Sequence, residues 1–185
     1  IYPLTSVADQ INACDLAVIC NVNFARPMLD VARKAGKWIA TDVHAVADLD
    51  DPYNQDYMRT AQILFISSDS LSDTPEETAN QALDRFGNEV VVIGLGSEGA
   101  LLAMKHGIME FFPSIYTRPV INTIGAGDAL FSCFVHEFCK DQNPLRALRY
   151  ATVFASFKIG EVGAAEGFLN EEDLEQWVRK SVQKY

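Results

Sequence analysis

The chain has 185 residues, of which 49% are hydrophobic and 22% charged, and its formal net charge at pH 7 is −10. This length and composition are typical of one globular domain, whereas the negative charge argues against nucleic acid or an anionic membrane as a partner, since both would repel it. No apolar run reaches the roughly 18 residues needed to span a bilayer, and the first residues lack the layout of a signal peptide, so the cytoplasm is the expected location.

The first half of the chain alternates short apolar runs with segments of helical periodicity. Residues 15–20 predict a buried strand, and residues 25–36 predict a helix that ends at Gly36. Further buried strands are predicted where apolar residues follow one another without strict alternation, at 37–42, 62–67 and 89–96. This order is typical of a parallel sheet with helices packed on its faces, so the predicted fold class is α/β.

Residues 72–87 carry the clearest helix signal. Three capping candidates at 72–74 precede Pro75, two glutamates occupy the expected first turn, and Gly87 follows the expected end. From Ala100 the pattern changes, because two apolar runs flank residues 105–107 and predict a hairpin.

The last third of the chain is predicted to be helical. The expected helices cover about 125–140, 144–159 and 171–182. Pro144 and Asn170 suit the starts of the second and third. Since no internal repeat or linker interrupts the chain, a single α/β domain over residues 1–185 is predicted.

The four cysteines are Cys14, Cys20, Cys133 and Cys139. They form no CxxC pair and lie inside apolar segments, so buried free thiols are predicted rather than a disulfide framework. Zinc held with His136 is an alternative, but the spacing suits no common zinc site.

The segment "GLGSEG" at 94–99 matches the GxGxxG pattern of dinucleotide-binding proteins. That pattern binds a pyrophosphate only when a helix begins within it, and the residues after Gly99 read as a strand. A dehydrogenase that binds NAD is therefore disfavoured. Two readings stay open: a ligand-binding turn at the carboxyl end of a strand, and a plain turn into the hairpin.

A second glycine-rich segment, "NTIGAGDALFSCFVHEF" at 122–138, leads directly into a helix. The helical spacing of the apolar residues after Asp128 places residues 125–127 in the first turn, where backbone N–H groups lack helical partners. Small residues and the helix dipole there suit a phosphoryl group, and Asp128 could accept the proton of an attacking hydroxyl. The structural alternative is an aspartate favoured only by the dipole, after glycines that merely make a turn.

The segment "NTIGAGDA", together with "VVVIGLGSEGALL" at 90–102, resembles the PfkB or ribokinase family of carbohydrate kinases. The family signature is DTxGAGD, and this chain differs from it only at Asn122. The resemblance extends from about Asp15 to Val182. It implies a ribokinase-like three-layer α/β/α fold with a mostly parallel sheet, and ATP-dependent phosphorylation of a sugar or sugar-like hydroxyl.

The resemblance also implies roles for particular residues. Asp128 corresponds to the catalytic base, and the amides of Gly125, Ala126 and Gly127 correspond to the anion hole. The residues implied at the nucleotide are Gly96, Ser97, Glu98, Gly99, Thr123, Thr152, Ala155 and Gly163. Magnesium would accompany ATP, held mostly by phosphates and water.

Two departures from the family bear on cofactors and activity. In members activated by potassium, carbonyls at positions matching Asn122, Ile124 and 158–163 bind the ion, and Asn122 removes a negative charge from that place. The family's NxxE element has no match in "FISSDSLSD" at 65–73, where Ser68 and Asp69 are the nearest substitutes. A non-catalytic nucleotide-binding or regulatory protein of the same fold is therefore the alternative function.

A third departure concerns the acceptor side. Family members usually carry a further N-terminal portion with most sugar contacts and a β-rich lid, and this chain starts after the matching point. The expected contacts with a sugar or nucleoside substrate are Asn21, Asn23 and Asp42, at strand ends. We expect the chain to be the C-terminal nucleotide-binding and catalytic part of such a kinase. It is then a fragment, or a chain whose open sheet edge is covered by a partner such as a second copy in a homodimer.

Overall fold

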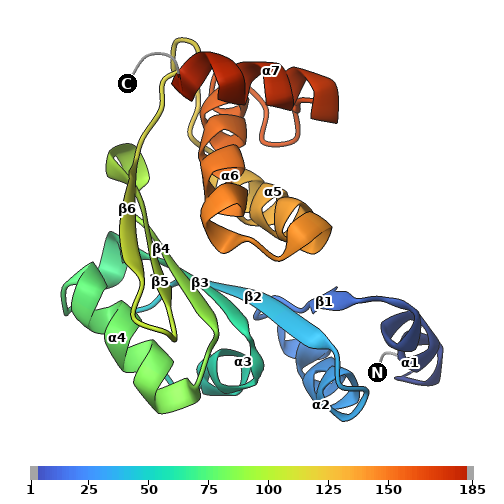
Figure 1. The fold of residues 1–185 in the computed structure, drawn as a ribbon. Coiled ribbons are helices and arrows are strands. Elements are labelled where there is room, and N and C mark those ends of the chain that lie inside the picture. Colours follow the sequence, from blue (N-terminus) through green and yellow to red (C-terminus); the bar gives the residue numbers. More distant parts are fainter. Residues whose placement is uncertain (1–3, 183–185) are drawn as a thin grey trace. The chain divides into compact units, whose positions relative to one another are not determined.

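The structure is a computed structural model that describes residues 4–182. The chain divides into two compact units (Figure 1). The first consists of the described part of Ile1–Gly96 together with Leu101–Glu110, and the second of Ser97–Ala100 together with the described part of Phe111–Tyr185. The prediction of a single domain therefore stays a prediction, and each unit is described by itself.

The first unit holds the α/β part of the fold. Its helices are α1 (Leu4–Ala13), α2 (Arg26–Lys34), α3 (Gln55–Thr60) and α4 (Pro75–Phe86). Its parallel strands are β1 (Leu16–Val18), β2 (Trp38–Ala45), β3 (Ile63–Ser67) and β4 (Val90–Gly94). The hairpin strands β5 (Gly99–Met104) and β6 (Met109–Pro113) complete the sheet, whose order is β1-β2-β3-β4-β5-β6.

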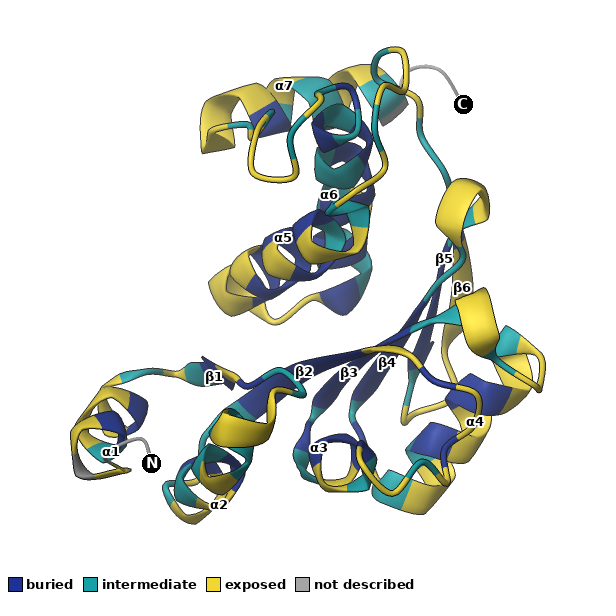
Figure 2. Cartoon of the chain, turned by 180° about the vertical axis from the view of Figure 1, so that it is seen from behind, coloured by how far each residue is buried: buried dark blue, intermediate teal, exposed yellow. Residues whose placement is uncertain are grey.

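The strands β1 to β4 pair in parallel in the order of the chain, with Leu16 opposite Trp38 and Ile63 opposite Val90. Helices α1 to α4 lie on one face of this sheet, as both views show (Figures 1 and 2). The first four residues of β3 and of β4 are all buried, so both faces of these strands are removed from solvent. This confirms the parallel strands predicted from continuous apolar runs.

Helix α4 begins and ends as its sequence predicts. Thr74 is the N-cap, and its hydroxyl accepts a hydrogen bond from the Glu77 amide at 3.2 Å while the Glu77 carboxylate accepts one from the Thr74 amide at 3.2 Å. This reciprocal capping box satisfies two helix-terminal donors. Gly87 ends the helix in a left-handed conformation, with φ of 73°.

The second unit is built on three helices, α5 (Ala126–Asp141), α6 (Pro144–Lys158) and α7 (Glu171–Val182). Phe134 and Phe138 stack on one face of α5 with ring centroids 6.0 Å apart. Asn143 caps α6 by accepting a hydrogen bond from the Arg146 amide at 3.0 Å, with Pro144 at the first helical position. All three predicted helices are confirmed to within two residues at each end.

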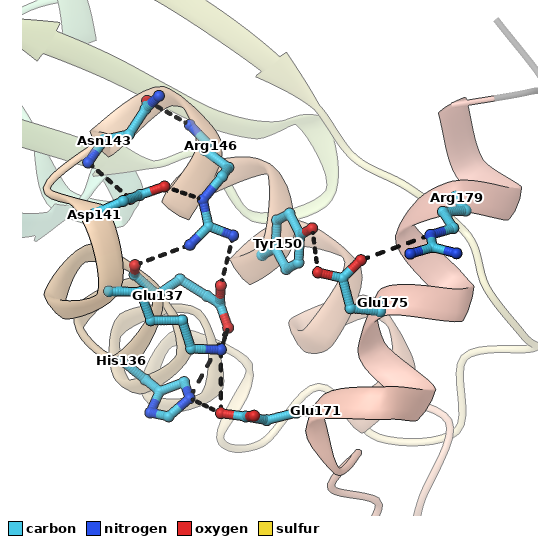
Figure 3. Close-up of polar contacts among 10 residues, drawn as sticks. His136, Glu137, Asp141, Asn143, Arg146, Tyr150, Glu171, Glu175 and Arg179 are labelled. Carbon is cyan, nitrogen blue, oxygen red and sulfur yellow. Dashed lines mark hydrogen bonds and ion pairs between the residues drawn. The ribbon is translucent and has the colours of Figure 1, made fainter.

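A buried carboxylate ties α5 to α6 (Figure 3). The side chain of Glu137 is 1% exposed and accepts hydrogen bonds from Lys140 and Arg146, each at 2.8 Å. Arg146 also binds Asp141 at 2.6 Å. Lys140 extends the group to Glu171 at the start of α7, and its hydrogen bond lowers the pKa of the Glu171 carboxyl. Because removing a partner from a buried charge is costly, the cations around Glu137 are needed once its carboxylate is buried.

We expect Arg146→Met to destabilise the protein by about 2 kcal/mol, since the buried Glu137 carboxylate would lose one of its two hydrogen-bonded cationic partners and keep Lys140. The matched control is Arg179→Met on α7, where Arg179 is 79% exposed and 3.8 Å from Glu175. That pair should contribute less than about 0.5 kcal/mol. Urea unfolding monitored by circular dichroism measures both changes. Equal losses in the two variants would contradict the importance of the buried cluster.

Several features differ from the sequence-based predictions. Helices α1 and α3 were not anticipated. None of the four cysteines, all within residues 4–182, forms a disulfide, in agreement with the prediction of thiols. The prediction that they are buried holds only for Cys133, since Cys14 and Cys20 are half-buried and Cys139 is exposed. Burial raises the pKa of the Cys133 thiol to about 12. Within residues 4–182, none of the helices is both long and apolar enough to cross a membrane.

Candidate nucleotide and phosphoryl-transfer site

The turn before α5 has the conformation that its glycine predicts. Gly125 is the N-cap residue with φ of 79°, a left-handed conformation that glycine adopts at little cost. The Ala126 amide donates to the Thr123 carbonyl at 3.1 Å, which closes the turn. The helix begins at Ala126, so the residues expected at the anion hole, Gly125, Ala126 and Gly127, do lie at a helix N-terminus, where a phosphate group is favoured.

Asp128 is the third residue of α5 and is exposed. The next residue, Ala129, is buried, and its amide makes a helical hydrogen bond to the Gly125 carbonyl at 3.0 Å. The carboxylate therefore stands in the first turn, beside the positive end of the helix dipole and open to solvent. This arrangement suits a group that accepts a proton from a bound hydroxyl.

The segment that precedes the turn lies along the end of α6 and the loop that follows it. The amides of Ile121 and Asn122 both donate to the Ile159 carbonyl, at 2.9 and 3.1 Å. The Asn122 side chain donates to the Val162 carbonyl at 2.6 Å and accepts from the Ile124 amide at 3.0 Å. The structure thus brings the signature segment and the late loop together, as the sequence resemblance implied.

Arg118 holds the same loop in place from inside. Its guanidinium donates to the Phe157 carbonyl and to the Glu161 carboxylate, both at 2.7 Å, and lies 3.8 Å from the centroid of the Phe157 ring. A Cβ atom on Gly160 would lie 2.2 Å from its Nε atom, and one on Gly167 would lie 2.8 Å from Nη2. The loop therefore packs closely around this side chain, and a larger residue at either glycine would displace it.

The residues around Asn122 and Ile124 do not fit a bound potassium ion. The Ile124 carbonyl already accepts a hydrogen bond from the buried ammonium of Lys158, and the Val162 carbonyl accepts one from Asn122. The side-chain oxygen of Asn122 accepts a hydrogen bond from the Ile124 amide. Carbonyl oxygens occupied by side-chain donors are poor ligands for a further cation.

The turn at Gly96–Glu98 is a single 3₁₀ turn between β4 and β5, and Gly96, Ser97 and Glu98 are exposed. Gly99 follows as the first residue of β5, with φ of 124°. Because a strand and not a helix follows Gly99, the geometry excludes the dinucleotide-binding arrangement of a dehydrogenase. An exposed turn at the end of β4 remains suited to a ligand.

The other residues expected near a nucleotide lie on α6 and in the late loop. Thr152 is buried, and its hydroxyl donates to the Arg149 carbonyl at 2.9 Å, so its one donor is used within the helix. Ala155 is half-buried on the same helix. Gly163 donates its amide to the Glu166 carboxylate at 3.2 Å, and Thr123 is exposed beside the turn before α5.

The residues expected at the sugar belong to the first unit. Asp42 is buried in β2, and one oxygen accepts a hydrogen bond from the His44 amide at 2.8 Å. Asn21 follows β1 and donates to the Val43 carbonyl at 3.1 Å and to Asn54 at 2.9 Å. These bonds tie the segment after β1 to β2 and to the start of α3. They use both hydrogens of the Asn21 amide group, so its side-chain oxygen is the atom left for a ligand. Asn23 is exposed in a 3₁₀ turn, Asn23–Ala25.

Two tyrosines that the sequence-based predictions did not include support the segment around Asn21. The hydroxyl of Tyr53 donates to the Asn21 carbonyl and that of Tyr57 to the Val22 carbonyl, each at 2.9 Å. Arg26 lies over both rings, 5.0 and 4.8 Å from their centroids. The available signal was the aromatic pair in "DPYNQDY", which precedes and opens the six-residue helix α3.

Comparisons with known proteins agree with this geometry. The chain is 29% identical over 114 residues to the ATP-dependent 6-phosphofructokinase isozyme 2 of Mycobacterium tuberculosis, an alignment that covers 60% of this chain and 32% of that protein. The chain thus spans about a third of the length of the curated relatives it matches.

Solved structures show the same fold. A microbiome-derived acarbose kinase superposes with a TM-score of 0.89 at 25% identity, covering 97% of this chain and 60% of that one. A ribokinase of Arabidopsis thaliana, solved with ribose and ATP, superposes with a TM-score of 0.77 at 18% identity, covering 94% of this chain and 59% of that one. The fold is therefore ribokinase-like.

A family model described as "pfkB family carbohydrate kinase" matches residues 17–172. The matched range includes both glycine-rich segments and all of α5 and α6. The chain belongs to the pfkB family of carbohydrate kinases.

Proposed function

We propose that this chain is the nucleotide-binding and catalytic part of a kinase that transfers the γ-phosphoryl group of ATP to a hydroxyl of a sugar or sugar-like molecule. The observation that carries the proposal is the first turn of α5. There, a left-handed glycine opens a helix N-terminus beside an exposed aspartate, in a chain of a carbohydrate kinase family.

In this proposal Asp128 is the base that accepts the proton of the attacking hydroxyl. The amides of Gly125 and Gly127 stabilise the negative charge on the transferring phosphoryl group, while the Ala126 amide, implied at the same anion hole, holds the turn closed through its bond to Thr123. The dipole of the 16-residue helix α5 adds to their effect. Positioning and charge stabilisation supply most of the rate in phosphoryl transfer, so a rigid helix terminus is well suited to this role.

The proposed nucleotide site consists of the exposed turn at Gly96–Glu98 with Gly99, together with Thr123, Thr152, Ala155 and Gly163. Magnesium would be held by the phosphates of ATP and by water and would neutralise their charge. We assign no residue of this chain to the metal. Ser68 and Asp69 lie in a 3₁₀ turn after β3, where Asp69 is exposed and its amide binds Ser67.

The proposed acceptor is a sugar or a nucleoside, bound with the help of Asn21, Asn23 and Asp42. The relatives named above act on or bind a phosphorylated sugar, acarbose or ribose according to their names, which supports the class of acceptor and not one member of it. The proposed location is the cytoplasm, where ATP is abundant. A homodimer formed at β1, one of the two outer strands of the described sheet, is part of the same proposal.

The test is a turnover screen of the full-length protein with ATP and magnesium over sugars, sugar phosphates and nucleosides, alongside calorimetric titration with ATP. Transfer of phosphate to one acceptor class supports the proposal. Binding of ATP without turnover on any acceptor would favour the second candidate, a non-catalytic nucleotide-binding protein. The turn at Ser68–Ser70 is the observation in favour of that candidate, since it offers neither the asparagine nor the glutamate of the family's NxxE element.

A further inference from the structure

Lys158, the last residue of α6, is fully buried next to the phosphate-binding turn. Its relative exposure is 0%, which is rare for a lysine without a charged partner. Its ammonium donates a hydrogen bond to the Ile124 carbonyl, the last carbonyl before Gly125. A Cβ atom on Gly125 would lie 3.5 Å from both the Cε and the Nζ atoms of Lys158, so the ammonium lies directly against the turn.

No carboxylate pairs with this ammonium among residues 4–182, and the Ile124 carbonyl is its only hydrogen-bond partner there. A buried cation without a counterion is costly. The Ala164 carbonyl also reaches the turn, 3.0 Å from the same Cβ position on Gly125. The Ile124 carbonyl that contacts the ammonium is a dipole of the kind that suits a monovalent cation, and the Ala164 carbonyl approaches the same turn.

The hydrogen bond to Ile124 fixes the direction of the first amide of the turn. The Ile124 carbonyl and the Gly125 N–H belong to one planar trans peptide, in which the two groups point in opposite directions. An ammonium that holds the carbonyl on the buried side therefore directs the Gly125 N–H to the opposite side, where the phosphoryl group is proposed to bind.

Asn122 completes this arrangement. It donates to the Val162 carbonyl, which an aspartate could not do, because an ionised carboxylate has no donor. Asn122 and Lys158 are thus a matched pair of donors for the carbonyls of the signature segment and the late loop.

We propose that the Lys158 ammonium acts as a built-in monovalent cation beneath the turn at residues 125–127. It orients the Gly125 amide and contributes positive potential to the bound phosphoryl group. It is a positioning residue, and it makes the protein's activity independent of added potassium. The role in catalysis rests on the proposed kinase function, whereas the effect on phosphate binding does not.

The first test uses the unaltered full-length protein and compares turnover in potassium and sodium salts at equal ionic strength. We expect equal rates. Stimulation by potassium would overturn the proposal, because the cation position would then be available to a free ion. This comparison requires no variant and so does not depend on the folding of one.

The second test is Lys158→Met, which preserves the length of the side chain and removes its charge. We expect kcat to fall about 100-fold with little change in KM for the acceptor, at the lower end of the loss seen when one stabilising donor is removed. Potassium or ammonium salts should restore part of the rate in this variant, and tetramethylammonium, which is too large, should not. A wild-type rate, or a loss that no small cation restores in a folded variant, would overturn the proposal.

The double variant Asn122→Asp with Lys158→Met is the sharper version of the same test. It supplies a carboxylate and releases both carbonyls, so its turnover should depend on potassium. Absence of potassium dependence in a folded double variant would count against the assigned role of Lys158.

A binding measurement separates this inference from the proposed function. Inorganic triphosphate, titrated by calorimetry, should bind Lys158→Met about tenfold more weakly than the unaltered protein. If the unaltered protein binds triphosphate in this Lys158-dependent way but turns over no acceptor, the kinase proposal fails and the cation role stands. Equal affinities in an otherwise active kinase would instead reject the cation role.

Discussion

Replacing Asp128 with asparagine should lower kcat about 1,000-fold in the full-length protein, since a positioned general base typically contributes 10²- to 10⁴-fold to a rate. The amide that replaces the carboxylate cannot accept the proton of the attacking hydroxyl. The affinity for ATP should change by less than about threefold, because the amides that bind phosphate are unaltered. Steady-state kinetics and calorimetric titration with ATP measure the two quantities.

The matched control is Glu172→Gln in the first turn of α7, where another exposed carboxylate lies near the positive end of a helix dipole. Each substitution removes one such carboxylate and should cost less than about 1 kcal/mol of stability. Only Asp128→Asn should reduce turnover. If it retained a rate within about tenfold of the unaltered protein, less than any general base contributes, the catalytic assignment of Asp128 would be wrong.

Gly99→Ala should reduce the stability of the protein by about 4 kcal/mol, a loss that combines left-handed backbone strain with steric overlap. Gly99 has φ of 124°, and a Cβ atom on it would lie 2.0 Å from the Phe112 carbonyl oxygen and 2.7 Å from the Ser114 amide nitrogen. Both neighbours are backbone atoms, so neither can rotate away. The Glu98 carbonyl also accepts a hydrogen bond from Ser114 at 2.9 Å, and the clash would break it.

Gly107→Ala separates the two contributions to this loss. Gly107 also has a positive φ, of 87°, but nothing lies within 4 Å of its Cβ position. Its substitution should therefore cost about 1 kcal/mol, the strain contribution alone. Urea denaturation of both variants gives the comparison, and similar losses would show that the close approach at Gly99 is not a constraint.

Local sequence signals predicted most of the fold. The capping residues of α4, the glycine that opens α5 and the continuous apolar runs of β3 and β4 each specify their conformation through neighbouring residues, so a sequence pattern is enough to identify them. Helix α3 was missed because its six residues are too short for helical periodicity to appear.

Long-range contacts account for what the sequence could not reveal at the site. The hydrogen bond of Lys158 to the Ile124 carbonyl joins residues 34 positions apart, and no local pattern in either segment predicts this contact. Asn122 illustrates the same limit: as a pattern it is only a departure from the family signature, and its contact with Val162 gives it a physical reason. The sequence likewise could not show that the Asn21 side-chain amide is used in a hydrogen bond to Asn54.

The Arg118 side chain also bears on the order in which the protein folds. The loop at residues 160–167 has a guanidinium, supplied from about forty positions earlier in the chain, as its internal support. Closing a contact over such a separation carries an entropic cost that local structure must offset first. The loop should therefore acquire its native shape after α6 has formed and the segment with Arg118 has docked on it. Substitutions in this loop are accordingly expected to accelerate unfolding more than they slow folding.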